Sequence, residues 1–153
     1  MSLQWDDSLE LGFDVIDQQH KGLVERFDKL SKAAQEGTSH ELIEELSFFL
    51  LEYAQKHFEA EEKIMEEYVY SKIETQRTEH AAFTRDANEL KSTIEQNGAT
   101  REVAIAATGK LLRWIIQHIK KHDKEMVAYI KECISLREKS LKHYKKDTAP
   151  LWL

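Results

Sequence analysis

Residues 41–64 read ELIEELSFFLLEYAQKHFEAEEKI, and the spacing of their apolar side chains decides the fold class. Apolar residues recur every three or four positions, which is the period of one face of an α-helix. We expect the buried face to carry Leu42, Leu46, Phe49, Tyr53, His57, Ala60 or Glu61, and Ile64. This face is apolar along its first half and turns polar at His57 and Glu61. A buried ionisable group needs a partner, so the helix predicts a site as well as a core.

Three further segments share this design of an apolar face interrupted by polar side chains. We expect helices over about residues 14–35, 38–66, 74–96 and 100–144. The interrupting side chains are His20 in the first helix, Gln76 and His80 in the third, and His118 in the fourth. Four amphipathic helices with short loops predict an all-α protein, an antiparallel up-down-up-down four-helix bundle with an N-terminal arm and an extended C-terminal helix.

The composition agrees with one helical domain. The chain has 153 residues, of which 41% are hydrophobic and 33% are charged, but only five are Gly and one is Pro. Few turn-forming residues favour long helices over sheets. We assign a single domain, 1–153, which consists of an N-terminal arm (1–13), a metal-binding bundle (14–125) and a helical extension with a tail (126–153).

Charge and cysteine content exclude several classes of protein. The formal net charge of −6 argues against a nucleic-acid partner, which requires a basic face. No run approaches the roughly 18 apolar residues of a membrane span, and the acidic N-terminus does not resemble a signal peptide. The single cysteine, Cys133, excludes an internal disulfide. We therefore expect a cytoplasmic protein with no nucleic-acid and no membrane partner.

The polar positions meet if the bundle is antiparallel. His20 lies near the start of the first helix and His57 near the end of the second. Gln76 and His80 begin the third helix, and His118 lies past the middle of the fourth. Because the chain direction alternates, these positions lie at the same end of the bundle. Separate sequence regions that converge on one small volume predict a metal centre.

The donor types narrow the choice of metal. Imidazole nitrogens with a few carboxylate oxygens suit iron, zinc, copper or nickel better than calcium or magnesium. Glu61 lies one turn after His57, where its carboxylate is well placed to bridge two ions. Few anionic ligands leave the ferric state of iron less favoured, which suits reversible dioxygen binding better than strong oxidation.

Several short sequences together resemble one family. They are Trp5, Asp17–Lys21 (DQQHK), His57–Glu62 (HFEAEE), Glu79–Phe83 (EHAAF), Trp114 and His118–Asp123 (HIKKHD). In this order they resemble the hemerythrin family, in particular its bacterial hemerythrin-like members. The resemblance covers residues 5–125, which is most of the chain.

The resemblance implies a centre of two non-haem iron ions, joined by an oxo or hydroxo group and by carboxylates, that binds dioxygen. The implied ligands are His20 and His57 on one iron, His80 and His118 on the other, and Glu61 and Asp123 as bridges. The implied lining of the dioxygen pocket is Phe58, Trp114, Ile115 and Ile119.

Gln76 departs from the family pattern, which has His-x-x-x-His where this chain has Gln76 and His80. An amide oxygen is a neutral and weaker donor than an imidazole nitrogen. Three outcomes stay open: Gln76 binds iron through its oxygen, a water fills the position, or the second iron binds weakly.

The second bridging ligand has two candidates. His118 and Asp123 are five residues apart, which is about 140° around an ideal helix. The helical period alone favours His122, one turn from His118. Two ions need a second bridging carboxylate, and the family pattern has one at this point. We therefore choose Asp123 as the bridging ligand. His122 is kept either as a residue that lies next to the ligands or as a substitute ligand.

We expect a protein that carries, stores or delivers dioxygen, and not an enzyme. A dioxygen or redox sensor that acts through a partner is one alternative, and a di-iron enzyme with peroxidase, ferroxidase or nitric-oxide activity is another. The chain ends in the apolar segment Ala149–Leu153. Two interpretations of this tail and of the helix before it stay open. Either they fold back on the bundle, or they form a surface for self-association or for a protein partner.

Overall fold

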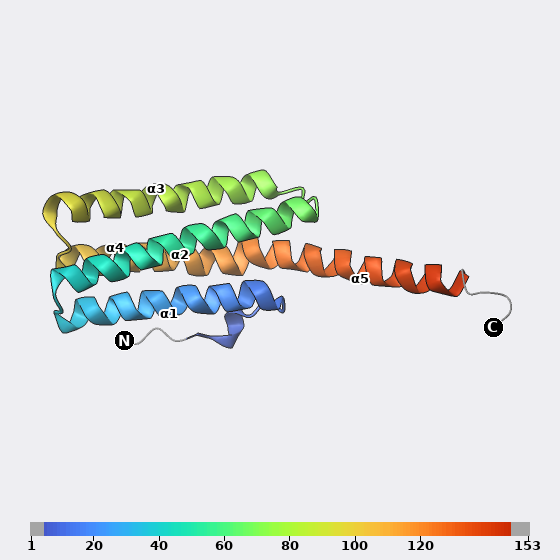
Figure 1. The fold of residues 1–153 in the computed structure, drawn as a ribbon, viewed down its shortest axis with the longest axis horizontal. Coiled ribbons are helices and arrows are strands. Elements are labelled where there is room, and N and C mark those ends of the chain that lie inside the picture. Colours follow the sequence, from blue (N-terminus) through green and yellow to red (C-terminus); the bar gives the residue numbers. More distant parts are fainter. Residues whose placement is uncertain (1–4, 148–153) are drawn as a thin grey trace.

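The computed structural model describes residues 5–147, and the side chains of residues 5–144. Its elements are the 3₁₀ turn η1 (Asp7–Leu9), the helices α1 (Asp14–Glu36), α2 (His40–Glu67), α3 (Ile73–Asn97) and α4 (Arg101–His118), the π-helical turn η2 (Ile119–Asp123) and the helix α5 (Lys124–Asp147). These residues contain no β-strand, and none of their helices is long and apolar enough to cross a membrane. The helices α1 to α4 lie side by side and alternate in direction (Figure 1). The all-α four-helix bundle predicted from the sequence is confirmed.

Polar caps and a glycine set the ends of the helices. The Ser39 hydroxyl accepts a hydrogen bond from the Leu42 amide at the start of α2, and the Thr100 hydroxyl accepts one from the Val103 amide at the start of α4. Gly37 ends α1 with a φ of 70°, a left-handed conformation that glycine adopts without steric cost. The loops are therefore short, which brings the start of one helix level with the end of the next.

The core consists of two apolar clusters with a polar layer between them. The larger apolar cluster fills most of the bundle and includes Leu23, Val24, Phe27, Leu30, Ile43, Leu50, Phe83, Leu90, Ile94 and Leu111. The smaller apolar cluster closes the other end and consists of Ile16, Met65, Tyr70, Met126, Val127 and Ile130. The polar layer consists of His20, His57, Glu61, Gln76, His80, His118 and Asp123. Apolar side chains on both sides shield this layer from water.

The buried face of α2 differs from the prediction in its first half. Leu42 and Phe49 expose 38% and 54% of their surfaces, and the residues buried in their place are Ile43, Ser47, Leu50 and Ala54. This part of α2 has apolar side chains nearly all round, so two faces fit the helical period equally well. Packing against the neighbouring helices decides between them. At His57 and Glu61 the prediction and the structure agree, since both side chains are buried.

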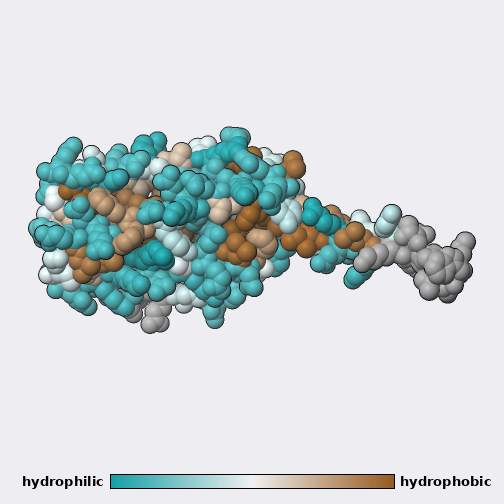
Figure 2. All heavy atoms as spheres, in the orientation of Figure 1, coloured by the Kyte–Doolittle hydropathy of each residue, from teal (hydrophilic) through white to brown (hydrophobic). Residues whose placement is uncertain are grey.

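The C-terminal helix leaves the bundle. Met126, Val127 and Ile130 of α5 lie in the smaller apolar cluster, whereas residues 135–144 are exposed. This part of α5 projects beyond the bundle (Figure 1) and presents apolar as well as polar side chains to solvent (Figure 2). Of the two alternatives for this segment, the one in which the helix folds back on the bundle is therefore wrong for residues 135–144. The tail Ala149–Leu153 lies outside the described residues.

Candidate metal centre

Seven side chains from four helices and one π-turn meet in the polar layer, and each exposes at most 3% of its surface. The contributors are His20 from α1, His57 and Glu61 from α2, Gln76 and His80 from α3, His118 from α4, and Asp123 from η2. The histidine and carboxylate positions that the resemblance implies as ligands therefore lie together. Gln76 lies among them.

Glu61 lies between the histidines of three helices. Its Oε1 is 2.9 Å from His57 Nε2 and 3.3 Å from His20 Nε2. Its Oε2 is 3.1 Å from His80 Nε2. One oxygen of the carboxylate thus faces His20 and His57, and the other faces His80. A carboxylate in this arrangement is suited to bridge two ions.

Asp123 makes a second connection across the layer. Its Oδ2 is 3.1 Å from His20 Nε2, and its Oδ1 is 3.2 Å from His118 Nε2. Like Glu61, Asp123 therefore places one oxygen on each side of the layer. Two carboxylates span the same two pairs of histidines.

The π-helical turn brings Asp123 into the layer. Residues five apart point about 140° away from each other in an ideal α-helix. Between His118 and Asp123 the chain widens into η2, Ile119–Asp123, and a π-helix brings residues five apart onto the same face. Asp123 is fully buried, whereas His122 is partly exposed and its Nε2 lies 3.8 Å from Glu79 Oε1. Asp123 thus belongs to the cluster, and His122 lies outside it.

Hydrogen bonds behind two of the histidines fix the direction of their rings. His57 Nδ1 donates to Gln19 Oε1 over 2.6 Å, and His80 Nδ1 donates to Glu62 Oε1 over 2.8 Å. A ring with its proton on Nδ1 keeps the Nε2 lone pair free for a metal. The role of Gln19 is not predicted from the sequence. It lies next to His20, about 100° around the helix, so the helical period carries no signal for it.

The carboxylates and imidazoles change one another's pKa values. Burial alone would lower the pKa of His20, but the nearby carboxylates of Asp123 and Glu61 raise it to about 9. Burial alone would raise the pKa of Glu61, but the nearby imidazoles of His57, His20 and His80 hold it well below its usual value. Burial and the charge of Glu61 oppose the ionisation of Asp123, but the nearby imidazoles of His118 and His20 lower its pKa. Both carboxylates are therefore anionic at neutral pH.

The layer contains polar atoms that are buried without a hydrogen-bond partner. Among them are Glu61 Oε2, Asp123 Oδ2, His80 Nε2, both ring nitrogens of His118 and Gln76 Oε1. Such atoms cost free energy unless another group binds them. Two subsets of the cluster bring their ligand atoms within 4.8 Å of one another: His20, His57, Glu61 and Asp123, and Glu61, His80 and His118. Because Glu61 belongs to both, the donor set fits two metal ions that share a carboxylate.

Gln76 contacts the second carboxylate. Its Nε2 donates a hydrogen bond to Asp123 Oδ1 over 3.0 Å, and its Oε1 is buried with no hydrogen-bond partner. Because Gln76 lies one turn before His80, the sequence predicts that it faces the ion beside His80, and it does not predict this contact with Asp123. Gln76 and Asp123 are 47 residues apart in the chain, so no local pattern joins them.

Aromatic side chains cover the polar layer on the side of the larger apolar cluster. Phe58 stacks on His80 with ring centroids 4.1 Å apart, and Trp114 stacks on His118 with centroids 4.5 Å apart. The four residues that the resemblance implies as pocket lining all belong to the larger apolar cluster or pack against it: Phe58, Trp114, Ile115 and Ile119. The polar layer is therefore bordered by apolar side chains on this side.

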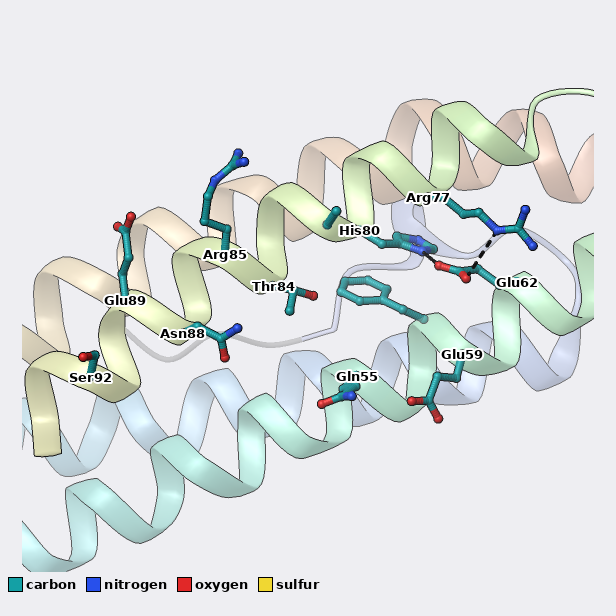
Figure 3. Close-up of a pocket in the computed structure, with 12 residues that line it drawn as sticks. Gln55, Glu59, Glu62, Arg77, His80, Thr84, Arg85, Asn88, Glu89 and Ser92 are labelled. Atoms are coloured by element: carbon teal, nitrogen blue, oxygen red, sulfur yellow. Dashed lines mark hydrogen bonds and ion pairs between the residues drawn. The ribbon is translucent and has the colours of Figure 1, made fainter.

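A groove of about 820 Å³ lies between α2 and α3 next to the polar layer. Figure 3 shows its lining, in which Glu62 lies between His80 and Arg77. Glu62 accepts from His80 Nδ1, and its other oxygen is 3.7 Å from Arg77 Nε. His80 and Phe58 belong to the lining, so the groove borders this side of the layer.

Comparison with known proteins identifies the family. The family profile described as "Hemerythrin HHE cation binding domain" matches residues 11–130. The chain belongs to the hemerythrin family. A bacteriohemerythrin of Pseudomonas aeruginosa is 33% identical over 133 residues, which cover 87% of this chain and 84% of that protein. A bacteriohemerythrin of Clostridium acetobutylicum is 30% identical over 129 residues, which cover 80% of this chain and 97% of that protein.

A solved structure supports the hemerythrin fold. A crystal structure of a hemerythrin mutant matches this chain with a TM-score of 0.75 and 22% sequence identity, and the match covers 84% of this chain and 98% of the other. Proteins of the hemerythrin family bind iron, and the polar layer of this member has histidine and carboxylate groups that can hold a metal.

Proposed function

We propose that this protein binds dioxygen reversibly at a pair of iron ions. The observation that carries the proposal is that two pairs of buried histidines share two buried carboxylates, Glu61 and Asp123. Relatives named bacteriohemerythrin and myohemerythrin support it. Two ferrous ions in this layer would supply the electrons that a bound dioxygen molecule takes up.

The protein side chains determine the charge around the ions. In this proposal the ligands are His20 and His57 on one side, His80 and His118 on the other, and Glu61 and Asp123 between them, with an oxo or hydroxo group completing the bridge. Neutral imidazoles outnumber the anionic carboxylates in this set. A donor set with little negative charge disfavours the ferric state, so it suits reversible binding better than permanent oxidation.

The apolar side of the layer has a role as well. Phe58 and Trp114 stack on the histidines there, and Ile115 and Ile119 expose 2% and 1% of their surfaces. These side chains exclude water and small anions, which need hydrogen bonds, but they accept an apolar molecule such as dioxygen. We propose that they line the place where dioxygen binds and protect it from solvent.

Iron analysis and an optical spectrum test the proposal. After the protein is loaded with Fe²⁺ under nitrogen, we expect up to two iron ions per chain, one for each subset of ligands. Exposure to air should produce a new visible absorption band that disappears when dioxygen is removed. His57→Ala removes a ligand and should abolish the band, whereas His40→Ala, at an exposed position of the same helix, should leave it unchanged.

Two results would contradict the carrier proposal. One is an iron-loaded protein whose spectrum does not respond reversibly to dioxygen. The other is steady turnover of peroxide, ferrous iron or nitric oxide, which would favour an enzyme.

A sensor that acts through a partner is the second candidate, and the projecting part of α5 favours it. Leu136 and Leu141 expose 56% and 53% of their surfaces there. The helix continues directly from η2, which carries Asp123, so a change at the site is connected to the exposed segment. Hydrogen exchange of α5 with and without dioxygen distinguishes the candidates. A sensor requires a change in α5, and a simple carrier does not.

A further inference from the structure

The two metal positions have matching histidines but unequal carboxylate oxygens. We name them the His20 position, with His20 and His57, and the His118 position, with His80 and His118. Among the described residues, three of the four carboxylate oxygens of the layer face only histidine nitrogens: both oxygens of Glu61 and Oδ2 of Asp123. Asp123 Oδ1 differs, because it also accepts a hydrogen bond from Gln76 Nε2 over 3.0 Å. This oxygen faces the His118 position.

The chemistry of the amide fixes the orientation of Gln76. An amide nitrogen donates hydrogen bonds and has no lone pair available for a metal. The reverse orientation would place Gln76 Oε1 against Asp123 Oδ1, two acceptors without a proton between them. Gln76 exposes 1% of its surface, so water does not compete for this contact. The hydrogen bond is therefore the arrangement that the anionic Asp123 carboxylate favours.

We infer that Gln76 positions Asp123 through its amide nitrogen, which makes the His118 position the weaker of the two. The inference rests on the metal pair of the proposed function. The Gln76 N–H group occupies one lone pair of Oδ1 and attracts part of its negative charge. Oδ1 is thereby a poorer donor to an ion at the His118 position. Oδ2 faces the His20 position and keeps its full donor strength.

Gln76 also affects the position that it does not face. Asp123 belongs to the irregular turn η2, and Gln76 belongs to α3, so their hydrogen bond restrains the carboxylate from a different element of the bundle. Without this restraint the Asp123 side chain can rotate, and both of its oxygens leave their places. Loss of the amide should therefore weaken the His20 position as well as the His118 position. A direct ligand would affect one position alone.

A titration of metal-free protein with Co²⁺, followed by absorption and calorimetry, tests the inference without dioxygen. The wild-type protein should bind Co²⁺ in two steps of unequal affinity. Gln76→His supplies an imidazole and should tighten the second step relative to the first by about tenfold, or 1.4 kcal/mol. Gln96→His makes the same change at an exposed position of α3 and should behave like the wild type.

Gln76→Met separates positioning from ligation, because it removes both polar atoms of the amide at nearly constant size. We expect both Co²⁺ steps to weaken by about tenfold, as when other hydrogen-bond partners of metal ligands are removed. Weakening of the second step alone would identify Gln76 as a ligand and overturn the inference. Two equal steps in the wild-type protein would also overturn it.

The remaining outcomes are distinguishable. If circular dichroism shows that Gln76→Met does not fold, the comparison of Gln76→His with Gln96→His decides alone, and equal behaviour of these two variants overturns the inference. The proposed function fails on a different measurement, the dioxygen spectrum of the iron-loaded wild-type protein. The Co²⁺ steps do not depend on that result.

Discussion

The larger apolar cluster and the polar layer are built on the same helices but are stabilised in opposite ways. Leu23, Phe27 and Leu50 in the cluster are completely buried, and burial of such a side chain contributes about 1.5–3 kcal/mol. His20 and Glu61 in the layer are equally buried. Their burial costs free energy unless their charges and lone pairs find partners. The helical period is the same in both regions, and the chemistry on the buried face differs.

This difference indicates how stability is divided within the bundle. The cluster needs only the exclusion of water, so we expect it to form without any ligand. The layer contains buried atoms without hydrogen-bond partners, such as Glu61 Oε2 and His80 Nε2. Binding of metal ions would engage these atoms, so the stability of the layer should depend on metal while that of the cluster should not.

Glu61→Ala should have the largest effect, because Glu61 contacts three of the histidines in the layer. We expect loss of both ions. Each bound ion adds about 4 kcal/mol to the free energy of unfolding when the free ion exceeds its dissociation constant a thousandfold. Elemental analysis and urea unfolding with and without metal measure this. Glu59→Ala, at an exposed neighbouring position, is the matched control and should retain the metal. Full metal content in Glu61→Ala would show that the carboxylate does not bridge.

Phe27→Ala should have the next largest effect and tests the cluster. The side chain is completely buried, so its removal should lower the free energy of unfolding by about 3–5 kcal/mol. Because Phe27 lies in the cluster and not in the layer, the loss should be the same in metal-free and metal-loaded protein. Urea unfolding under both conditions measures it. A loss that changes when metal is added would show that the two regions are energetically coupled.

Leu141→Ser should have the smallest effect. Leu141 exposes 53% of its surface on the projecting part of α5, away from both regions. We expect the free energy of unfolding to change by no more than about 0.5 kcal/mol and the metal content to stay the same. Thermal unfolding and metal analysis check this. A large loss of stability would mean that this side chain is packed in solution. The projecting part of α5 would then be a third region that contributes to stability, beside the cluster and the layer.

Sequence reasoning predicted the layer better than it predicted the first half of α2. A histidine on an apolar face, such as His20, stands out because Ile16, Leu23 and Val24, three or four residues away, are apolar. Along the first half of α2 nearly every face is apolar, so the period could not distinguish Phe49, which is exposed, from Leu50, which is buried. Gln19 is polar and lies off the helical period of the buried face. Its hydrogen bond to His57 is visible only in the folded chain.

The sequence by itself determined the helices, their antiparallel order and the level at which the donors meet, because these follow from local periodicity and short loops. The helical period favoured His122, whereas the need for a second bridging carboxylate and the resemblance to a family favoured Asp123. The tertiary structure decided in favour of Asp123 through a π-turn that local periodicity does not encode. It also decided which oxygen faces which histidine, and that Gln76 donates to Asp123. Such contacts join residues far apart in the chain, so they depend on how the helices pack against one another and not on any pattern within one helix.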